Sequence, residues 1–581
     1  HSLPAQNAAD FLALRNGRGG QILNSLLFTT AWAGTTEVTS SQDASNVTLN
    51  AGDTQNVKGG DANNVTINNG GVQNVSSGMA EYATISSGGV QNVYGGSAGN
   101  AYISNGGTQN VSGGNAIFTI VSSGGTQNVR GGDASHTTID SCGTQDVSSG
   151  IANSVIVSGE QSVSGGTATG ATVTGRQFVF GGDASNAVVS GIQYVYGGTA
   201  MFATISDGLQ IVDGGTATSA TISSGGNQTV RTGDASYVTI NNGGVQNVSG
   251  GQAQYATISS GGTQNVSGGD AGHATISSGG TQNVIGGDAI GASINSGGVQ
   301  NVSSGNAQRA TISSGGTQTV YAFGFAQYAQ IDNGGVQNVS GGNASNATIN
   351  NGGVQNVSSG NAIGAFINSG GVQFVNSGGT AHHATINSGG RQCLYSGAAV
   401  TASQVNAGGI LVISAGGSAV NATLADGYVL RADTDATLTT SAGGPTISGK
   451  TASNITLNSG GSLDVLGGGQ ASGTVISSGG TQTVISGDAD HAQINSGGQQ
   501  IVFGGNASSA TINSSGVQEV HIGYADQATI SSGGVQNVIG GNAQYAQIDN
   551  GGVQNVIGGN ARNATINNGG VQNVSSGDAS W

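Results

Sequence analysis

The stretch that decides the fold reads Ala256-Thr-Ile-Ser-Ser-Gly-Gly-Thr-Gln-Asn-Val-Ser-Gly-Gly-Asp-Ala271. It holds two short runs, residues 256–259 and 263–267, in which apolar and polar residues alternate and Thr, Val and Ile are frequent. A Gly-Gly pair follows each run, so the pattern predicts two short strands joined by tight turns. A helix is excluded, because the glycine pairs return about twice per unit and each glycine costs a helix about 1 kcal/mol.

This unit repeats along most of the chain. A Gln two residues before an anchoring Val, as in Gln264 and Val266, recurs from Val57 to Val574, most often at a spacing of 18 residues, and gives about 30 units. A fixed period of this kind is typical of a solenoid, in which each unit buries its apolar side by stacking on its neighbours. We predict an all-β parallel β-helix of about 30 coils, on the order of 140 Å long at about 4.8 Å per stacked strand.

The composition narrows the function classes. Glycine supplies 110 of 581 residues, charged residues make up 7%, and the net charge is −16 with only 11 Lys and Arg. This charge balance argues against a nucleic-acid partner and against a polybasic membrane surface. A chain of this neutral, polar, glycine-rich composition folds only when its residues repeat with a fixed period, as they do here.

The alternation assigns the two sides of each strand. If Val266 points inward, Gln264 also points inward, and Thr263 and Asn265 point outward. Stacked inward amides can then bond from coil to coil, because each would otherwise cost about 1 to 3 kcal/mol when buried without a partner. We expect the inward Gln position to be taken by other residues at Ile410, Gly427, Pro445 and Leu463.

The repeat divides the chain into segments. Residues 41–394 predict a regular β-helix with shorter coils at 147–212, residues 395–470 predict irregular coils with a bend or join, and residues 471–581 predict a second regular stretch. Residues 1–40 do not match the repeat. Two interpretations stay open there: a helical or irregular cap over the first coil, or a residual leader, since Arg15, Arg18 and the apolar run that follows resemble a signal peptide.

The repeated Gly-Gly-x-Gln-x-Val motif, in register over roughly residues 41–581, resembles the self-associating autotransporter adhesins of the AIDA-I, antigen 43 and TibA type. The resemblance implies a right-handed β-helix secreted through the outer membrane by type V secretion and displayed at the cell surface. It also implies self-aggregation, adhesion and biofilm formation. Because the last repeat is interrupted at Trp581, before any autochaperone segment or C-terminal barrel, we expect a processed or partial passenger.

The resemblance further implies O-heptosylation of repeat serines by a dedicated heptosyltransferase. The candidate acceptors lie in the Ile-Ser-Ser-Gly-Gly turns: Ser259, Ser277 and Ser313. Other implied partners are a second copy of the chain and host-cell or matrix glycans. No cofactor is implied.

Rows of outward polar residues suggest how two rods meet. Matched rows of amides and hydroxyls can exchange many weak hydrogen bonds between rods, and the low charge limits repulsion. The candidate self-association residues are Asn247, Asn265, Asn283 and Asn301 in one row, and Thr239, Thr257 and Thr275 in another.

Aromatic residues gather at two places. They mark a binding patch or a sugar-stacking platform, or alternatively they stack on each other across coils and stabilise the rod. The candidates are Phe178, Phe180, Tyr194 and Tyr196 in the short coils, and Tyr321, Phe323 and Phe325 in an inserted turn.

Catalysis has little support in the sequence, and we predict no enzyme and no metal site. Polysaccharide-cleaving β-helices need clustered carboxylates with Lys or Arg, yet the two lysines, Lys58 and Lys450, are far apart. Many of the glycine turns contain a single Asp, and one carboxylate per turn is typical of an Asx turn, in which the Asp side chain bonds to a nearby backbone N–H. Cys142 and Cys393 are about 14 coils apart and cannot pair. An ice-binding solenoid and a glycan-active enzyme remain the alternative functions.

Overall fold

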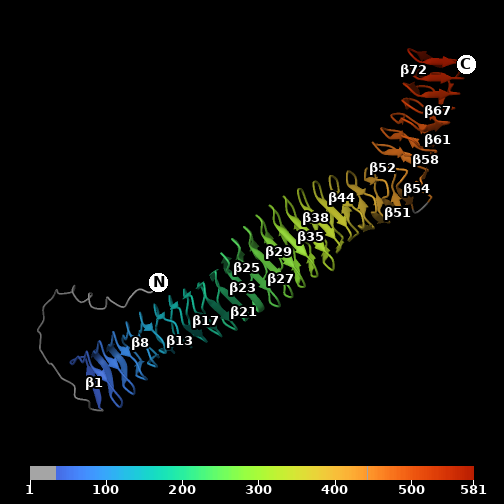
Figure 1. Cartoon of the computed structure of the whole chain (residues 1–581). Helices are drawn as coiled ribbons and strands as arrows, with labels where there is room; N and C mark the ends of the chain where they lie inside the picture. Colours follow the sequence, from blue (N-terminus) through green and yellow to red (C-terminus); the bar gives the residue numbers. More distant parts are fainter. Residues whose placement is uncertain (1–33, 441–442) are drawn as a thin grey trace.

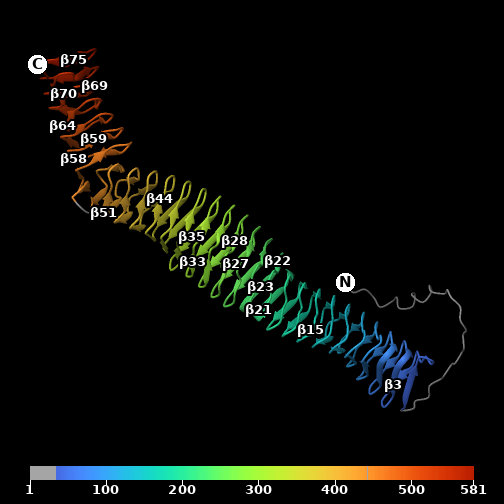
Figure 2. The ribbon, with the colours of Figure 1, turned by 180° about the vertical axis from the view of Figure 1, so that it is seen from behind.

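The computed structural model describes residues 34–440 and 443–581. These residues form a long rod of stacked coils, and Figures 1 and 2 show the rod from two opposite sides. Thirty strands, one per coil, line up in a single sheet, and shorter strands form the other sides of the coils. The predicted all-β parallel β-helix of about 30 coils is therefore confirmed. Within the described ranges, no helix is long and apolar enough to cross a membrane.

One coil shows how the sequence builds the rod. Strand β26 (Thr257–Ile258) and strand β27 (Thr263–Val266) are joined by the turn 259–262, and both pair in parallel with the next coil, with β28 (Thr275–Ile276) and β29 (Thr281–Val284). In the turn, Gly261 has φ +77°, which favours glycine. A Cβ on Gly262 would lie 2.6 Å from the carbonyl carbon of Ile240, so the close stacking of turns requires glycine there too.

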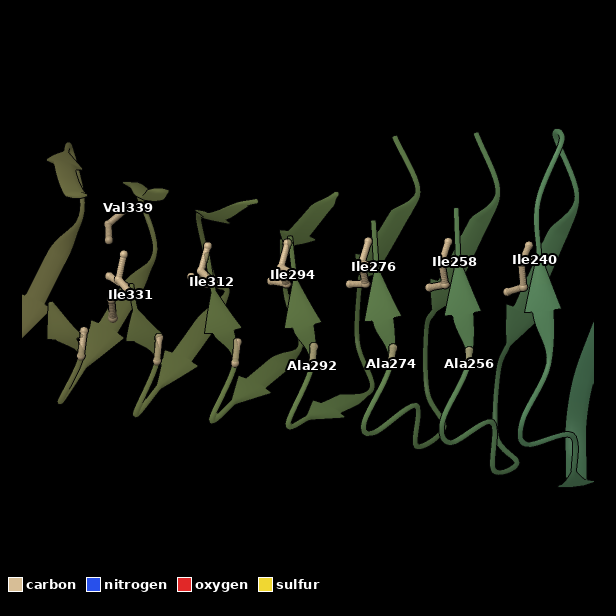
Figure 3. Packing of buried hydrophobic residues seen from close by; sticks show 14 of the residues in the cluster. Ile240, Ala256, Ile258, Ala274, Ile276, Ala292, Ile294, Ile312, Ile331 and Val339 are labelled. Carbon is tan, nitrogen blue, oxygen red and sulfur yellow. The ribbon is translucent and has the colours of Figure 1, made fainter. Parts of the chain in front are cut away.

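The core is a set of columns that run along the rod. Val266 and Ile258 are completely buried, as are their counterparts in neighbouring coils. Figure 3 shows the isoleucine column, from Ile240 to Ile331, beside the smaller alanine column that contains Ala256 and Ala274. Burial of a side chain of this size contributes about 2 kcal/mol, so stacking supplies the stability that a single coil lacks.

Buried glutamines form a second kind of column, the glutamine ladder. The side-chain Nε2 of Gln264 donates to Oε1 of Gln246 at 2.7 Å, and Gln282 donates to Gln264 in the same way at 2.7 Å. Every coil from Gln55 to Gln392 repeats this bond, and the ladder resumes from Gln482 to Gln572. The inward position of Gln is confirmed.

The two segments of the ladder have hydrogen-bond partners at three of their four ends. Gln55 donates to the carbonyl oxygen of Ala44 at 3.1 Å, and Gln392 accepts from the buried hydroxyl of Ser403 at 3.0 Å. Where the ladder resumes, Gln482 donates to the buried hydroxyl of Thr474 at 3.0 Å. An amide chain needs a terminal acceptor and a terminal donor, and these residues supply them.

The stack begins earlier than expected. Strand β1 (Thr35–Thr39) pairs in parallel with β3 (Thr54–Asp61), and Val38 lies opposite Val57 in the buried anchor column. Residues 35–39, which we expected to belong to a cap or a residual leader, thus already belong to the sheet. The rest of that segment, residues 1–33, lies outside the described residues.

The short coils keep the register of their neighbours. Val147, Val163, Val179 and Val195 are 16 residues apart and pair directly with one another. The two residues lost per coil come from the turn, where Ser-Gly, as in Ser158-Gly159, replaces Ser-Ser-Gly-Gly. The anchor and glutamine columns therefore pass through this region unchanged.

The glutamine ladder is interrupted at the join between two stretches of rod. Gln392 pairs with Leu411 and then Leu430, so the inward position is taken by these leucines rather than by Ile410 and Gly427 as we expected. Both leucines are buried, which removes the need for an amide partner. Leu463 takes the position as expected, whereas Pro445 lies outside the stacked coils.

At the join the register shifts by two residues. Ala432, in strand β52 (Val429–Asp433), pairs with Ile413 of the anchor column on one side, but with Leu463 of the glutamine column on the other. A shift of two keeps every side chain on its own face but displaces the columns. The inserted strands β53 (Thr437–Thr440), β54 (Thr446–Ser448) and β55 (Thr451–Ser453) pair antiparallel. Figure 1 shows the rod changing direction here, between β51 (Ser418–Leu424) and β58 (Gln470–Ser472).

The glutamine ladder predicts the effect of removing one amide. In a Gln264→Ala variant, Oε1 of Gln246 loses its donor and Nε2 of Gln282 keeps only the carbonyl oxygen of Ala271, 3.3 Å away. The coils around residue 264 should therefore lose about 2 kcal/mol of local stability. Amide hydrogen exchange of residues 246–284 measures this loss. Asn265→Ala, which removes a half-buried amide from the outer side of the same strand, is the control. If the amides of residues 246–284 were equally protected from exchange in the two variants, the stabilising role of the buried Gln264 amide would be contradicted.

The join predicts a dependence on pH. Asp433 and Asp464 are paired across β52 and β57 (Ser462–Val465), and burial raises the pKa of both carboxyl groups. Between the unfolded and the raised folded pKa the folded chain binds more protons, so stability falls as pH rises through this window. Asp464→Asn should therefore slow hydrogen exchange in β57 at neutral pH and have little effect below the unfolded pKa of about 4. Faster exchange at neutral pH would contradict this.

Candidate functional site

The outward asparagines form a continuous row, the asparagine column. Asn265 donates to Asn247 at 2.9 Å, Asn283 donates to Asn265 at 2.9 Å, and Asn301 donates to Asn283 at 3.0 Å. These side chains are half-buried. Each bond uses one N–H and one acceptor site, so every amide keeps a second N–H and further acceptor capacity toward the outside.

The threonine candidates form a row of their own, the threonine column. Thr239 pairs with Thr257 and Thr257 pairs with Thr275. Thr257 and Thr275 are exposed, and Thr239 is half-buried. The threonines belong to the sheet of two-residue strands, whereas the asparagines belong to the thirty-stranded sheet. The structure brings the members of each set together but places the two sets on different sides of the coil.

The serine candidates are less accessible than we expected. Ser259, Ser277 and Ser313 are half-buried, and the backbone N–H of each bonds to the preceding coil. The serine that follows each of them is exposed and has a φ of +47° to +48°, because it occupies the tip of the turn: Ser260, Ser278 and Ser314. The tip serine is therefore the more exposed of the two serines in each turn.

The first aromatic group is a four-membered stack. Phe178 of β17 (Arg176–Val179) lies 5.0 Å from Tyr194 of β19 (Ile192–Val195), and Phe180 lies 5.4 Å from Tyr196, with ring planes within 10° in both pairs. This is the stabilising cross-coil arrangement that we considered as the alternative to a binding patch. Each such pair contributes about 1 kcal/mol beyond its buried area. The edges of Phe180 and Tyr196 stay exposed.

The second aromatic group is exposed to solvent. Tyr321 and Phe325 are exposed by 44% and 42%, and Phe323 by 78%. They flank the turn between β35 (Thr317–Tyr321) and β36 (Phe325–Gln327), and Phe323 has a positive φ of 67°. An apolar ring held at the tip of a turn is exposed enough to contact a partner.

A further column was missed by sequence reasoning. In most coils one residue has a φ near +55°, three positions before the buried Ile of the short strand, and we call this row the corner column. Left-handed backbone costs a residue with a side chain roughly 1–2 kcal/mol, and Gly or Asn tolerates it best. Several corner residues are nevertheless aromatic or His: Tyr82, Phe118, His136, Phe202, Tyr237, Tyr255, His273, Tyr328, His383, His491 and Tyr545. The recurrence of such residues before Ala-Thr-Ile is the sequence signal that would have found them.

A hollow of about 570 Å³ opens beside this column. Its floor is formed by glycines of four successive coils, from Gly214 to Gly269, in pairs except at Gly233. Its polar rim is formed by Thr216, Asp234, Gln252 and Asp270. Asp234 is held by an Asx turn, in which its Oδ1 accepts from the N–H of Ser236 at 3.0 Å, as expected for the turn aspartates.

Ionisable residues are dispersed. His521 lies 3.2 Å from Glu519, and Lys58 lies 2.7 Å from Glu37. In residues 34–440 and 443–581, no three His, Cys, Asp or Glu side chains are close enough to hold a metal ion together. The two cysteines are free, and burial raises the pKa of the Cys393 thiol, which keeps it protonated.

Comparisons with known proteins agree with the repeat. Residues 439–498 match the family model "Adhesin of bacterial autotransporter system, probable stalk". A crystal structure of a TibA fragment, hyper-glycosylated in a reaction catalysed by TibC, is 27% identical over 70% of this chain and 98% of that chain, with a TM-score of 0.25. This TM-score is too low to argue for a common overall shape. No curated protein matches the chain. The family match supports the resemblance drawn from the repeat: residues 439–498 are similar to the stalk of autotransporter adhesins.

Proposed function

We propose that this chain is the passenger of an autotransporter adhesin, secreted through the outer membrane and displayed at the cell surface. Rods on neighbouring cells hold each other by lateral contacts, and this produces aggregation, adhesion and biofilm formation. Host-cell or matrix glycans are further partners. We propose no enzymatic activity, since the ionisable side chains are dispersed along the rod.

The observation that carries the proposal is the asparagine column. It offers one unused N–H per coil, and its members are fixed in line by their own hydrogen bonds. A single contact between rods contributes only about 1 kcal/mol, but the column repeats it in each coil from Asn247 to Asn301. Side chains that are already ordered also lose little conformational entropy on contact.

The asparagine column predicts the effect of added charge. Asn247→Lys together with Asn283→Lys places positive charges in alternate coils, far enough apart to leave the rod folded. Cells that display this variant should aggregate at least tenfold less in a settling assay, because rods that meet along this surface repel each other.

Thr257→Lys together with Thr275→Lys is the matched variant on the other side of the coil. Loss of aggregation only in this second pair would assign the contact to the threonine column. If both pairs settled like the unmodified cells, neither column would be the contact surface.

A second proposal concerns modification. We propose that repeat serines accept heptose from a dedicated transferase, and the exposure of Ser260, Ser278 and Ser314 favours these tip residues over Ser259, Ser277 and Ser313. A transferase must reach the hydroxyl oxygen, which is freely accessible only at the tip of the turn. Peptide mass spectrometry of passenger produced with its transferase should locate the sugar on the tip serines. A passenger of unmodified mass would refute the modification, and sugar on Ser259 would refute the choice of position.

A further inference from the structure

The longest aromatic stack of the corner column protrudes from the rod, and we call it the aromatic ridge. It consists of Tyr237, Tyr255 and His273, with ring centroids 5.0 and 4.9 Å apart and ring planes within 16°. The tyrosines are exposed by 59% and 44%. Because the rings stack along the rod, their faces cover each other and their edges point outward. The ridge therefore presents apolar edges, phenol hydroxyls and imidazole N–H groups.

The ridge occupies positions that disfavour such residues. Tyr237, Tyr255 and His273 have φ values of 60°, 58° and 56°. Other coils place Asn or Gly at the same position, as in Asn186 and Gly291. Backbone strain of this kind is concentrated at functional sites, so the ridge calls for a role beyond the stability of the coil.

The hollow lies in the same coils as the ridge. Its rim residues Asp234, Gln252 and Asp270 pair with one another in a narrow strip, and only the segment from Asp270 to Gly272 separates the hollow from His273 in that coil. The ridge and the hollow thus flank this strip on its two sides. Both repeat once per coil, so their periods are identical.

The geometry points to a second copy of this chain as the occupant of the hollow: two rods lie side by side with parallel axes, and each aromatic ridge enters the hollow of the other rod. Ridge and hollow match in chemistry as well as in spacing. The Tyr hydroxyls and the imidazole N–H of the ridge are donors, and the carboxylates of Asp234 and Asp270 on the rim are acceptors. The glycine floor leaves room for ring edges.

The orientation follows from symmetry. A twofold axis parallel to the rods reverses the lateral order of ridge and hollow in the second copy, so each ridge faces a hollow. A twofold axis across the rods keeps the lateral order, so ridge would face ridge. Parallel rods anchored in one membrane satisfy the first arrangement. This inference rests on the proposed self-association but assigns it a different surface, one that joins rods of the same cell.

Disulfide trapping tests the parallel pair. Gln252 is exposed and lies in the strip next to the twofold axis, so a Gln252→Cys side chain meets its own copy in the parallel, in-register pair. The background is Cys142→Ser, which removes the exposed native thiol, while the buried Cys393 stays. Oxidation of the purified chain should give a covalent dimer at Gln252→Cys, and at least tenfold less at Thr257→Cys on the threonine column. A dimer at Thr257→Cys but not at Gln252→Cys overturns the inference.

A ridge variant separates packing from folding. Tyr237→Asn together with Tyr255→Asn removes the ridge but uses a residue that this column already accommodates at Asn186 and Asn346. The variant should keep its circular dichroism and lose at least tenfold of the trapped Gln252→Cys dimer. An unchanged yield of dimer overturns the inference.

Cell aggregation distinguishes this inference from the proposed function. Cells that settle normally while no Gln252→Cys dimer forms would retain the proposed function and refute the parallel pair. A trapped dimer with cells that do not settle would retain the parallel pair and refute the proposed function.

Discussion

The buried glutamine ladder is the constraint on which the rest of the rod depends. A buried amide without a partner costs about 1 to 3 kcal/mol, so each Gln must meet the Gln of the next coil. The bond from Gln264 to Gln246 forms only when the two coils stack in exact register. One polar atom pair per coil thereby fixes the lateral position of every strand, which hydrophobic contact alone does not do, because Val and Ile pack acceptably after a slip of two residues.

The join shows what happens when this constraint is absent. Leucines replace glutamine at positions 411, 430 and 463, and the register then shifts by two residues between β52 and β57. The shift preserves burial, since residues two apart share a face. The change in rod direction thus occurs where no amide bond opposes it, and the flanking hydroxyls of Ser403 and Thr474 close the two ladders on either side.

The period and the alternation predicted the fold class, the inward Gln and the outward Asn, because these depend only on which residues face the core. They did not predict the register at Leu411 or Leu430, since without Gln the sequence offers several apolar residues that fit the slot. They also did not predict which serine is exposed or that Tyr255 is left-handed, because both depend on how each turn closes over the preceding coil. Strand β1 was missed because Val38 lacks the Gln two residues before it.

The register that the buried glutamines fix also determines how the outward side chains are arranged. Because coils cannot slip, every outward side chain stands directly above its counterpart, and a weak contact made once is repeated along the rod at the spacing of the coils. Residues whose backbone conformation costs stability are also aligned from coil to coil. The rings of the left-handed Tyr237 and Tyr255 stack because the fixed register places one directly above the other. Surface columns of this kind bind an object with the same period best, and a second copy of the chain has that period by construction.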